Sequence, residues 1–390
     1  MYCIPRRALR LRGCSFVGMN VYRSLLAPLL FRFDPESIHH SAYYWLEQAG
    51  KHTFSREALQ RTFRAVPDVR LNQRIMGLDF AHPVGLAAGF DKDARVYPAL
   101  GALGFSHIEI GTLTPKPQPG NERPRLFRLK EDRALINRMG FNNAGVDRAA
   151  ERITSSNRPL LGGNIGKNKT TPNEKASEDY CYALKALRHK VDYFTINISS
   201  PNTPGLRALQ DKEPLSRLLE AIQEENHRGT PLPILLKLAP DLTETALIEA
   251  AELVNEFQLE GVIATNTTLD RTGLKTPQSI IESIGAGGLS GAPLRQKSTE
   301  AVRLLRKTLL PQKVIVGVGG IFTASDVIEK LAAGADLVQL YTGFVYEGPT
   351  VVRDIVTELN HALETGQWIW RSRFASPSPL AETRAETTTP

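Results

Sequence analysis

The sequence predicts an α/β protein whose main body is a (β/α)8 TIM barrel, preceded by a small helical extension. Eight short runs in the chain of 390 residues are apolar almost throughout, as expected of parallel strands buried on both faces. Helical patterns separate these runs, and polar or glycine-rich segments follow most of them. An open, doubly wound sheet is the alternative, because counting strands does not distinguish the two. The runs are residues 83–90, 105–114, 159–165, 191–199, 233–239, 261–267, 313–319 and 337–343.

Amphipathic patterns identify the helices between the strands. Residues 243–257 carry Leu247, Ala250, Ala251 and Val254 at helical spacing, and residues 295–309 repeat the pattern. We expect residues 67–365 to form one catalytic barrel, because barrels commonly exceed the usual length of one domain.

The composition argues against a disulfide-bonded protein and against a metal-binding protein. Hydrophobic residues make up 42% of the chain, enough for a large core. The three cysteines, Cys3, Cys14 and Cys181, show neither paired nor metal-ligand spacing, which indicates a reducing compartment. The eight histidines form no metal-binding motif, so no metal is expected.

The N-terminal region is basic and amphipathic. No acidic residue precedes Asp34, whereas arginines accumulate there among leucines and phenylalanines. The longest apolar run, Leu25 to Phe31, is far shorter than the ~20 residues that cross a bilayer. We therefore expect residues 19–66 to lie on an anionic membrane surface. Capping of the barrel's N-terminal end is the alternative.

The ends of the chain are expected to lie outside the fold. Residues 1–18 are a basic extension that also has the composition of a transit peptide, or that precedes a true start at Met19. Residues 366–390 are predicted to be a disordered tail, because the stretch after Ala375 lacks apolar periodicity.

A helix begins within the extension at Asp34-Pro35-Glu36. An N-cap side chain, a proline in the first turn and an early acidic residue occur there together. The apolar stripe of this helix consists of Ile38, Ala42, Trp45 and Ala49.

The segment Asn197 to Gly205 is the most informative part of the chain. It places hydroxyls and amides directly after a predicted strand, and its two prolines stiffen it. An ordinary turn would use the same residue types. A catalytic loop is favoured because similar polar clusters follow other strands, as at Thr265 to Thr268.

Lys237 follows the apolar run 234–236 within a predicted strand. A buried ammonium is costly unless it meets an anion, so we expect either a ligand or a structural ion pair there.

Glycine-rich segments at 287–291 and 317–320, with Tyr341-Thr342-Gly343, favour a phosphate site at the last strands. The loop 137–143, rich in amides, is placed to close over a substrate.

These residues resemble the class 2, quinone-dependent dihydroorotate dehydrogenases. The similarity runs in family order from about Phe33 to about Leu359. The matching stretches are AAGFDKD, IEIGTLTPKPQPGN, PRLFRL, INRMGFNN, NIGKNK, INISSPNTPGLR, LKLAPDL, GVIATNTTLDR, GGLSGAPL, VGVGGI and LVQLYTGF.

The resemblance implies a barrel that binds one FMN and oxidises dihydroorotate to orotate in pyrimidine synthesis, passing electrons to a membrane quinone. It makes Ser200 the catalytic base, sends the hydride to flavin N5, and suggests Thr203 and a water path near Phe141 for the proton. The implied substrate-binding residues are Lys92, Asn137, Arg138, Met139, Gly140, Phe141, Asn197, Asn202, Asn266 and Thr267. The implied FMN-binding residues are Ala88, Gly89, Phe90, Asp91, Lys92, Thr112, Asn164, Asn197, Lys237, Thr265, Gly291, Gly320, Tyr341 and Thr342.

The resemblance also assigns the N-terminal helices to a quinone tunnel, with His39 and Arg125 at its inner end. It implies no nucleic acid and no obligate protein partner. The expected location is the cytoplasmic face of the cell's inner membrane, with the mitochondrial inner membrane as the alternative.

Three other hypotheses remain: a class 1 relative, which would need cysteine at position 200; a lyase that uses Lys237 as a Schiff base; and a non-catalytic membrane adaptor.

Overall fold

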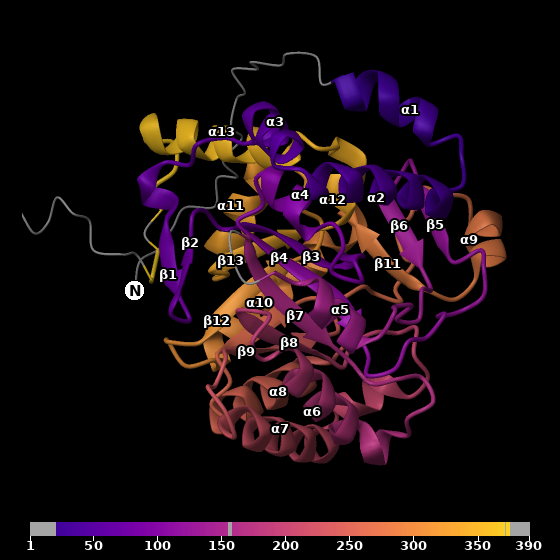
Figure 1. Cartoon of the computed structure of the whole chain (residues 1–390), viewed down its shortest axis with the longest axis vertical. Helices are drawn as coiled ribbons and strands as arrows, with labels where there is room; N and C mark the ends of the chain where they lie inside the picture. Colours follow the sequence, from indigo (N-terminus) through magenta and orange to yellow (C-terminus); the bar gives the residue numbers. More distant parts are fainter. Residues whose placement is uncertain (1–20, 155–157, 371, 375–390) are drawn as a thin grey trace, which may run out of the picture.

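The computed structural model describes residues 21–154, 158–370 and 372–374. Its centre is a closed barrel of eight parallel strands that follow one another in chain order, which confirms the predicted barrel and excludes the open sheet (Figure 1). Each strand falls within one of the eight predicted runs, apart from one residue at the end of the first. The strands are β3 (Val84–Asp91), β4 (His107–Leu113), β7 (Leu160–Ile165), β8 (Tyr193–Asn197), β9 (Ile234–Leu238), β10 (Gly261–Ala264), β12 (Val314–Val318) and β13 (Leu337–Leu340).

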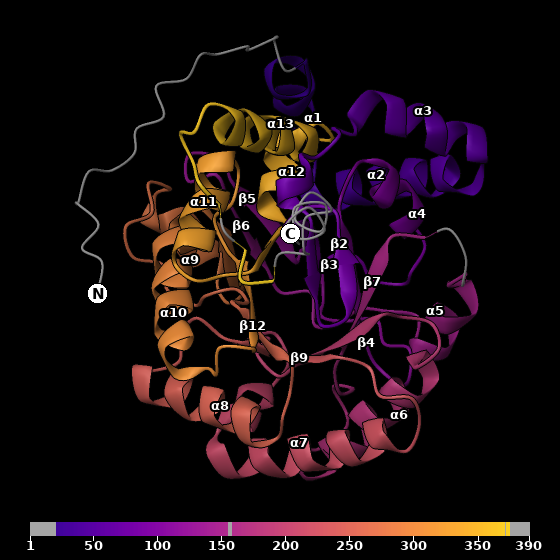
Figure 2. The same cartoon turned by 90° about the vertical axis from the view of Figure 1, so that its left-hand side faces the viewer.

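Helices surround the barrel (Figure 2). They bury one apolar face each against the strands, and α8 and α10 occupy the predicted ranges, with Leu247 and Val302 among their buried residues. The helices that follow the barrel strands are α4 (Tyr97–Ala102), α5 (Val146–Arg152), α6 (Ala176–Leu187), α7 (Lys212–His227), α8 (Glu244–Glu256), α10 (Arg295–Thr308), α11 (Ala324–Ala332), α12 (Thr342–Glu347) and α13 (Val351–Glu364).

A hairpin that we did not predict closes the N-terminal end of the barrel. It consists of β1 (Gln73–Ile75) and β2 (Leu78–Phe80). Ile75 and Phe80 are buried there against Tyr193 and Val314, which lie at the first positions of their strands. The C-terminal end of the barrel, where the polar residues follow the strands, is therefore the open end.

A second small sheet lies at the C-terminal end of the barrel. It contains β5 (Leu126–Leu129), β6 (Ala134–Asn137) and β11 (Gly288–Gly291), in the order β11-β6-β5. Helix α9 (Gln278–Ile284) packs on it through Ile281 and Ile284. These segments were expected to be loops, because each strand has only four residues. Pairing of Asn137 with Gly288 brings two predicted site segments together.

The N-terminal extension is helical, as predicted. A π-type turn (Tyr22–Leu26) leads into α1 (Ala27–Leu30), which is followed by α2 (Pro35–Lys51) and α3 (Thr53–Phe63). The Asp34 carboxylate accepts a hydrogen bond from the Ser37 N–H at 2.7 Å, so the predicted N-cap is confirmed. None of the described helices has both the length and the hydropathy that a membrane span requires.

These helices do not cap the N-terminal end of the barrel, so that alternative is wrong. The Tyr43 hydroxyl donates to Asp91, the last residue of β3, and α2 packs against α4 and β5 beside the open face. The inner face of α2 carries Glu36 and Tyr43, whereas Trp45 of the predicted apolar stripe is 70% exposed.

The predicted tail begins too early. Trp368 and Trp370 stack on each other and pack against the core, and the Arg373 guanidinium pairs with Asp336 at 2.9 Å. Residues 366–370 and 372–374 are therefore part of the fold. Residues 1–18 and the stretch after Ala375 lie outside the described residues.

Candidate active site

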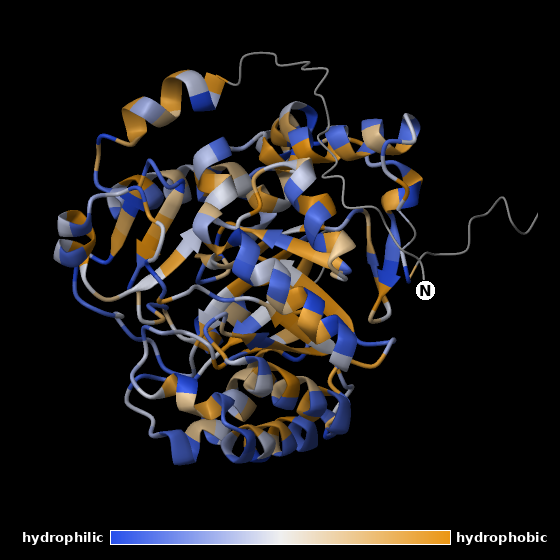
Figure 3. Cartoon of the chain, turned by 180° about the vertical axis from the view of Figure 1, so that it is seen from behind, coloured by the Kyte–Doolittle hydropathy of each residue, from blue (hydrophilic) through white to orange (hydrophobic). Residues whose placement is uncertain are grey.

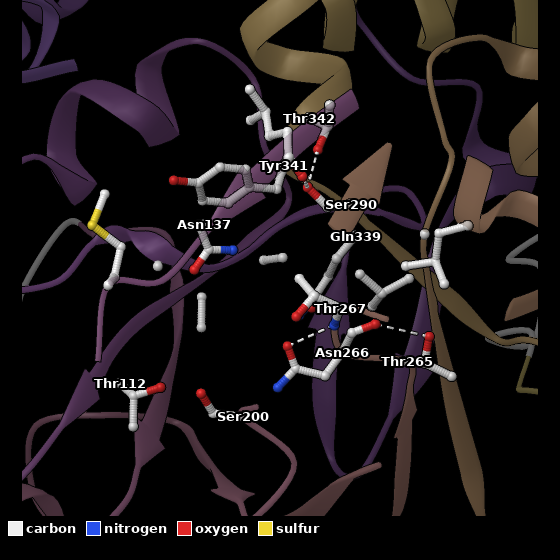
Figure 4. Close-up of a pocket in the computed structure, with 18 of the residues that line it drawn as sticks. Thr112, Asn137, Ser200, Thr265, Asn266, Thr267, Ser290, Gln339, Tyr341 and Thr342 are labelled. Atoms are coloured by element: carbon white, nitrogen blue, oxygen red, sulfur yellow. Dashed lines mark hydrogen bonds between the residues drawn. The ribbon is translucent and has the colours of Figure 1, made fainter. Parts of the chain in front are cut away.

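A cavity opens at the C-terminal ends of the barrel strands, between the barrel and the second sheet (Figure 4). It gathers residues from distant parts of the chain, as expected of the functional face of a barrel. The predicted site residues that line it are Ala88, Gly89, Lys92, Thr112, Asn137, Met139, Gly140, Phe141, Asn197, Ser200, Asn202, Lys237, Thr265, Asn266, Thr267, Gly291, Gly320, Tyr341 and Thr342.

Ser200 stands on the loop after β8 and faces this cavity (Figure 4). Its hydroxyl accepts a hydrogen bond from the Asn202 N–H at 3.2 Å, and the Asn202 amide donates to Asn137 at 3.1 Å. The nearby Thr203 hydroxyl is buried and has no hydrogen-bond partner among the described residues. The loop therefore holds one hydroxyl beside an amide pair and leaves a second hydroxyl free to bind water.

The loop after β10 meets the Ser200 loop from the other side. The Asn266 amide donates to the Ser199 hydroxyl at 2.9 Å and to the side-chain oxygen of Asn197 at 3.3 Å. The Thr267 N–H donates to the Asn266 side chain at 2.8 Å. Together these amides present both donors and acceptors to a polar ligand.

A chain of hydrogen bonds supports the floor of the cavity. Asn197 donates to the Thr112 hydroxyl at 2.8 Å, and Thr112 donates to Asn164 at 2.5 Å. Asn164 is completely buried and is not among the lining residues, so it lies one layer below the cavity. Its place in this chain makes it a support for Thr112 and Asn197.

Glu109, which was not predicted as a site residue, lies at the centre of this network. Its carboxylate is fully buried inside the barrel and accepts hydrogen bonds from Asn164 at 3.0 Å, Thr195 at 3.1 Å and Gln339 at 2.8 Å. A carboxylate only accepts, so it fixes which end of each amide faces it. A charged residue in the middle of the apolar run 105–114 was the available signal.

Lys237 projects from β9 into the cavity and is 5% exposed. Burial lowers the pKa of its ammonium group, and the charge of Glu109 acts in the opposite direction. Among the described residues it makes no hydrogen bond, and no carboxylate forms an ion pair with it. The structural ion pair that we weighed as the alternative is therefore not formed there, and the cation faces the cavity.

Lys92 supplies a second cation at the edge of the cavity. Its ammonium donates to the Asn142 side chain at 2.9 Å. Burial and the nearby Arg125 charge lower its pKa to about 8. An anionic group bound beside it would stabilise its charged form.

The glycine-rich segments meet where a phosphate was expected. A Cβ added to Gly343 would lie 2.1 Å from the Ile321 carbonyl oxygen, so only glycine allows the loops after β12 and β13 to touch. The backbone N–H groups of Gly320, Thr342 and Gly343 have no acceptor within the described part of the chain. The Ser290 and Thr342 hydroxyls lie 2.8 Å apart beside them. This donor set suits a dianionic phosphate.

Besides Asn164, three residues that were predicted to contact a ligand do not line the cavity. Asp91 does not reach the cavity, because its carboxylate accepts the Val96 and Tyr97 N–H groups at 2.9 and 2.7 Å and caps α4. The Arg138 guanidinium points away and donates to the Pro124 carbonyl at 3.1 Å. Phe90 packs behind the cavity against other aromatic rings. The three side chains support the site without facing it.

Neither of the two predicted quinone residues lines the cavity, because His39 belongs to α2 itself and Arg125 lies against that helix. The Arg125 guanidinium pairs with Glu36 at 2.9 Å and donates to the Pro119 carbonyl at 2.7 Å. The His39 ring packs edge-on against Phe90 at 5.0 Å between centroids, and burial lowers its pKa to about 3. His39 is therefore neutral where it contacts the barrel.

Several lining residues were not predicted. The apolar members have no signal in the sequence, because a leucine at a cavity wall resembles a core leucine. Gln339 is a polar residue within an apolar strand, and its Oε1 atom is buried without a partner among the described residues. The additional residues include Leu126, Leu135, Leu294, Ile321 and Gln339, whereas Asn142 and Ser290 lie within segments that were predicted to face the site. Within the described ranges, no group of three or more histidine, cysteine, aspartate or glutamate side chains is arranged to hold a metal ion.

Comparison with known proteins agrees with this geometry. The family model described as dihydroorotate dehydrogenase matches residues 70–363. The chain is 55% identical over 336 residues to "Dihydroorotate dehydrogenase (quinone)" of Christiangramia forsetii, which covers 86% of this chain and 97% of the relative. It is 49% identical over 359 residues to the protein of the same name from Thermosynechococcus vestitus. That match covers 88% of this chain and 97% of the relative.

Solved structures of dihydroorotate dehydrogenase (DHODH) also resemble this chain. The crystal structure of ligand-free DHODH from Eimeria tenella superposes with a TM-score of 0.77 at 36% identity, covering 87% of this chain and 98% of that one. Its complex with ferulenol gives a TM-score of 0.74 at the same 36% identity, covering 86% and 93%. The chain belongs to the dihydroorotate dehydrogenase family, in its quinone-dependent class.

Proposed function

We propose that this protein oxidises dihydroorotate to orotate with FMN as the prosthetic group and a membrane quinone as the electron acceptor, in pyrimidine synthesis. The observation that carries the proposal is the meeting of three features in one cavity at the functional end of the barrel: Ser200, the asparagine amides, and Lys237, which has no ion-pair partner within the described ranges. The names of the relatives support the same reaction.

The residues fit FMN. The N–H groups of Gly320, Thr342 and Gly343 suit its phosphate, because glycine leaves that backbone accessible. Lys237 offers the only lysine ammonium on the barrel strands that line the described cavity, and it would offset negative charge on a reduced ring. When bound, FMN accepts a hydride from the substrate. Asn197 and Thr112 would hold its polar edge.

Ser200 is the proposed base that removes the substrate proton. A serine hydroxyl is a weak base, so the proton must leave through a second group. Thr203 supports this route, because its hydroxyl is buried nearby without a partner among the described residues, and Phe141 lines the same cavity. Orotate carries a carboxylate and an imide edge, which match Lys92 and the amides of Asn137, Asn202 and Asn266.

The N-terminal helices are proposed to bind the membrane and admit the quinone. Apolar side chains of the Tyr22–Leu26 turn and of α1, α2 and α3 are exposed, including Leu25, Leu29, Trp45 and Phe54, which is 82% exposed. Figure 3 shows apolar residues on α1, which projects from the barrel body. Burial of such side chains in lipid, together with arginines near anionic headgroups, supports reversible association. His39 and Arg125 would lie at the inner end of the quinone path.

The cytoplasmic face of the inner membrane is the proposed location, with the mitochondrial inner membrane as the alternative. A class 1 relative is disfavoured by serine at position 200. A lyase would use Lys237 as a nucleophile but would leave the phosphate-type donors at Gly320 and Thr342 without a role. A membrane adaptor would leave the whole polar cavity unexplained.

A stopped-flow anaerobic titration tests the proposal. The purified yellow protein is mixed with dihydroorotate, and flavin absorbance is followed before a quinone is added. We expect bleaching by dihydroorotate and recovery with quinone. Ser200→Ala should retain FMN and lose the reduction step. A colourless protein that does not take up FMN, or flavin that dihydroorotate leaves oxidised, would refute the function.

A further inference from the structure

Arg207 connects the two loops that carry the reactive side of the cavity. It lies in the 3-10 turn Leu206–Gln210, just after the Ser200 loop. Its Nε donates to the Ser199 carbonyl at 3.1 Å, and its Nη2 donates to the Thr267 carbonyl at 3.0 Å. Ser199 adjoins Ser200, and Thr267 itself lines the cavity. One guanidinium thus joins the loop after β8 to the loop after β10.

Asp241, from the loop after β9, holds this guanidinium in place. It accepts from Arg207 Nη1 at 2.9 Å, from the Leu269 N–H at 3.0 Å and from the Lys297 ammonium at 2.9 Å. It also accepts from the Thr268 hydroxyl. The Arg207 and Asp241 side chains are 22% and 20% exposed, so they are only partly screened by water. Three neighbouring loops and α10 are therefore tied to one ion pair.

Neither member of the pair lines the cavity. On the cavity side, Asn266 bonds to Ser199, and the pair supports the same two loops from behind. We infer that Arg207 and Asp241 are positioning residues for the proposed reaction, and that they set the place of the Ser200 hydroxyl relative to Asn266 and Thr267. The inference rests on the proposed function of this site.

The geometry requires arginine at this position. The guanidinium donates in three directions, to two backbone carbonyls and one carboxylate, and its flat fork keeps these directions fixed. Lysine keeps the charge but places all its donors on one atom at the end of a flexible chain. Arg207→Lys therefore separates the fixed geometry from the charge.

The chain offers a matched control pair. Arg158 donates to Asp192 at 3.0 Å, with side-chain exposures of 13% and 21%, at the opposite end of the barrel. Arg158→Lys should cost similar stability without disturbing the cavity. Both variants are purified with bound flavin, and three quantities are measured: thermal midpoint, orotate binding from the flavin spectrum, and the rate of flavin reduction at saturating dihydroorotate.

We expect Arg207→Lys to reduce flavin roughly tenfold to a hundredfold more slowly than wild type, because small misplacements of a reacting group have effects of that size. Its orotate dissociation constant should change by less than about threefold, since the amides of the cavity remain. Asp241→Asn should show the same split between rate and binding. Added guanidinium should restore part of the rate in Arg207→Ala and none in Ser200→Ala.

The outcomes separate the inference from the function on which it rests. If dihydroorotate does not reduce the wild-type flavin, the proposed function fails. If it does, and Arg207→Lys reduces as fast as Arg158→Lys, the positioning role is refuted. An equal loss of rate in both lysine variants would also refute it, because the loss would then follow stability. If Arg207→Ala does not fold, the lysine variant and its control still decide.

Discussion

Replacing Glu109 with glutamine tests the buried network beneath the cavity. The wild-type carboxylate accepts three hydrogen bonds, from Asn164, Thr195 and Gln339, and acts on the charge of Lys237. Glutamine keeps the shape and one acceptor oxygen, but its NH2 group faces donors. At least one of the three bonds must therefore break or turn over.

The size of the effect follows from burial. Leaving a buried hydrogen-bonding group without its partner costs about 1–3 kcal/mol, and bonds to a charged group such as the Glu109 carboxylate lie at the upper end of that range. Glutamine retains one acceptor, so we expect a loss near 3 kcal/mol in the free energy of unfolding for Glu109→Gln. The pKa of Lys237 should fall further, because Glu109 is the group whose charge raises it.

A double-mutant cycle with Lys237→Met provides the assay. Urea unfolding of flavin-free wild type, both single variants and the double variant gives the coupling energy without a contribution from flavin binding. We expect the double variant to be more stable than the sum of the single effects predicts, by about 1–3 kcal/mol. The control is Lys330→Met, which removes another fully buried lysine, in α11, whose ammonium donates to the Arg295 carbonyl at 2.8 Å.

One result would contradict a coupling between Glu109 and Lys237. If Glu109→Gln and Lys237→Met add within about 0.5 kcal/mol, as Glu109→Gln and Lys330→Met should, the two charges do not depend on each other. Lys237 would then be stabilised by something other than Glu109.

Three further predictions concern the flavin, the pH dependence and the membrane. Lys237→Met should release FMN more readily on dialysis or lower the flavin midpoint potential, and native behaviour in both would reassign the lysine. The His82 ring stays neutral because its Nδ1 accepts the Val84 N–H and its Nε2 faces the Gly104 carbonyl at 2.9 Å. Burial lowers its pKa from 6.5 to about 4, so its contribution, about 3 kcal/mol, is present above pH 6.5 and is lost as the pH falls towards 4. Urea unfolding at pH 7.5 and 5 should show about 2 kcal/mol of this loss, and His82→Asn should reduce the difference between the two pH values. Deleting residues 1–50 should spare flavin reduction by dihydroorotate while removing liposome binding and quinone turnover; unchanged quinone kinetics would exclude the helices from the quinone path.

The local pattern of the chain determined the barrel. Eight apolar runs with helices between them leave few arrangements that bury both faces of every strand, so the strands appeared where the runs predicted them. The Asp34 cap is similarly local, since it depends on residues three positions apart. Most polar residues at the strand ends met in one cavity for the same reason, because parallel strands of a barrel end on one face.

Contacts between distant residues decided what the sequence left open. The four-residue strands β5, β6 and β11 are too short to be recognised alone and exist because they pair with one another. Asp91 and Arg138 lie in the matching motifs, but backbone groups of α4 and the Pro124 carbonyl bind them, and no sequence pattern reveals which way a side chain turns.

The same limit applies to the charges. The sequence identified Lys237 as a buried cation, whereas Glu109, Arg207 and Asp241 became visible only when folding placed their partners around them. Hydrogen bonding between residues far apart in the chain depends on directions fixed to within tenths of an ångström. The residue types and their order therefore determined the barrel and the contents of the site, and the tertiary structure decided which of those groups face the ligand and which hold the others in place.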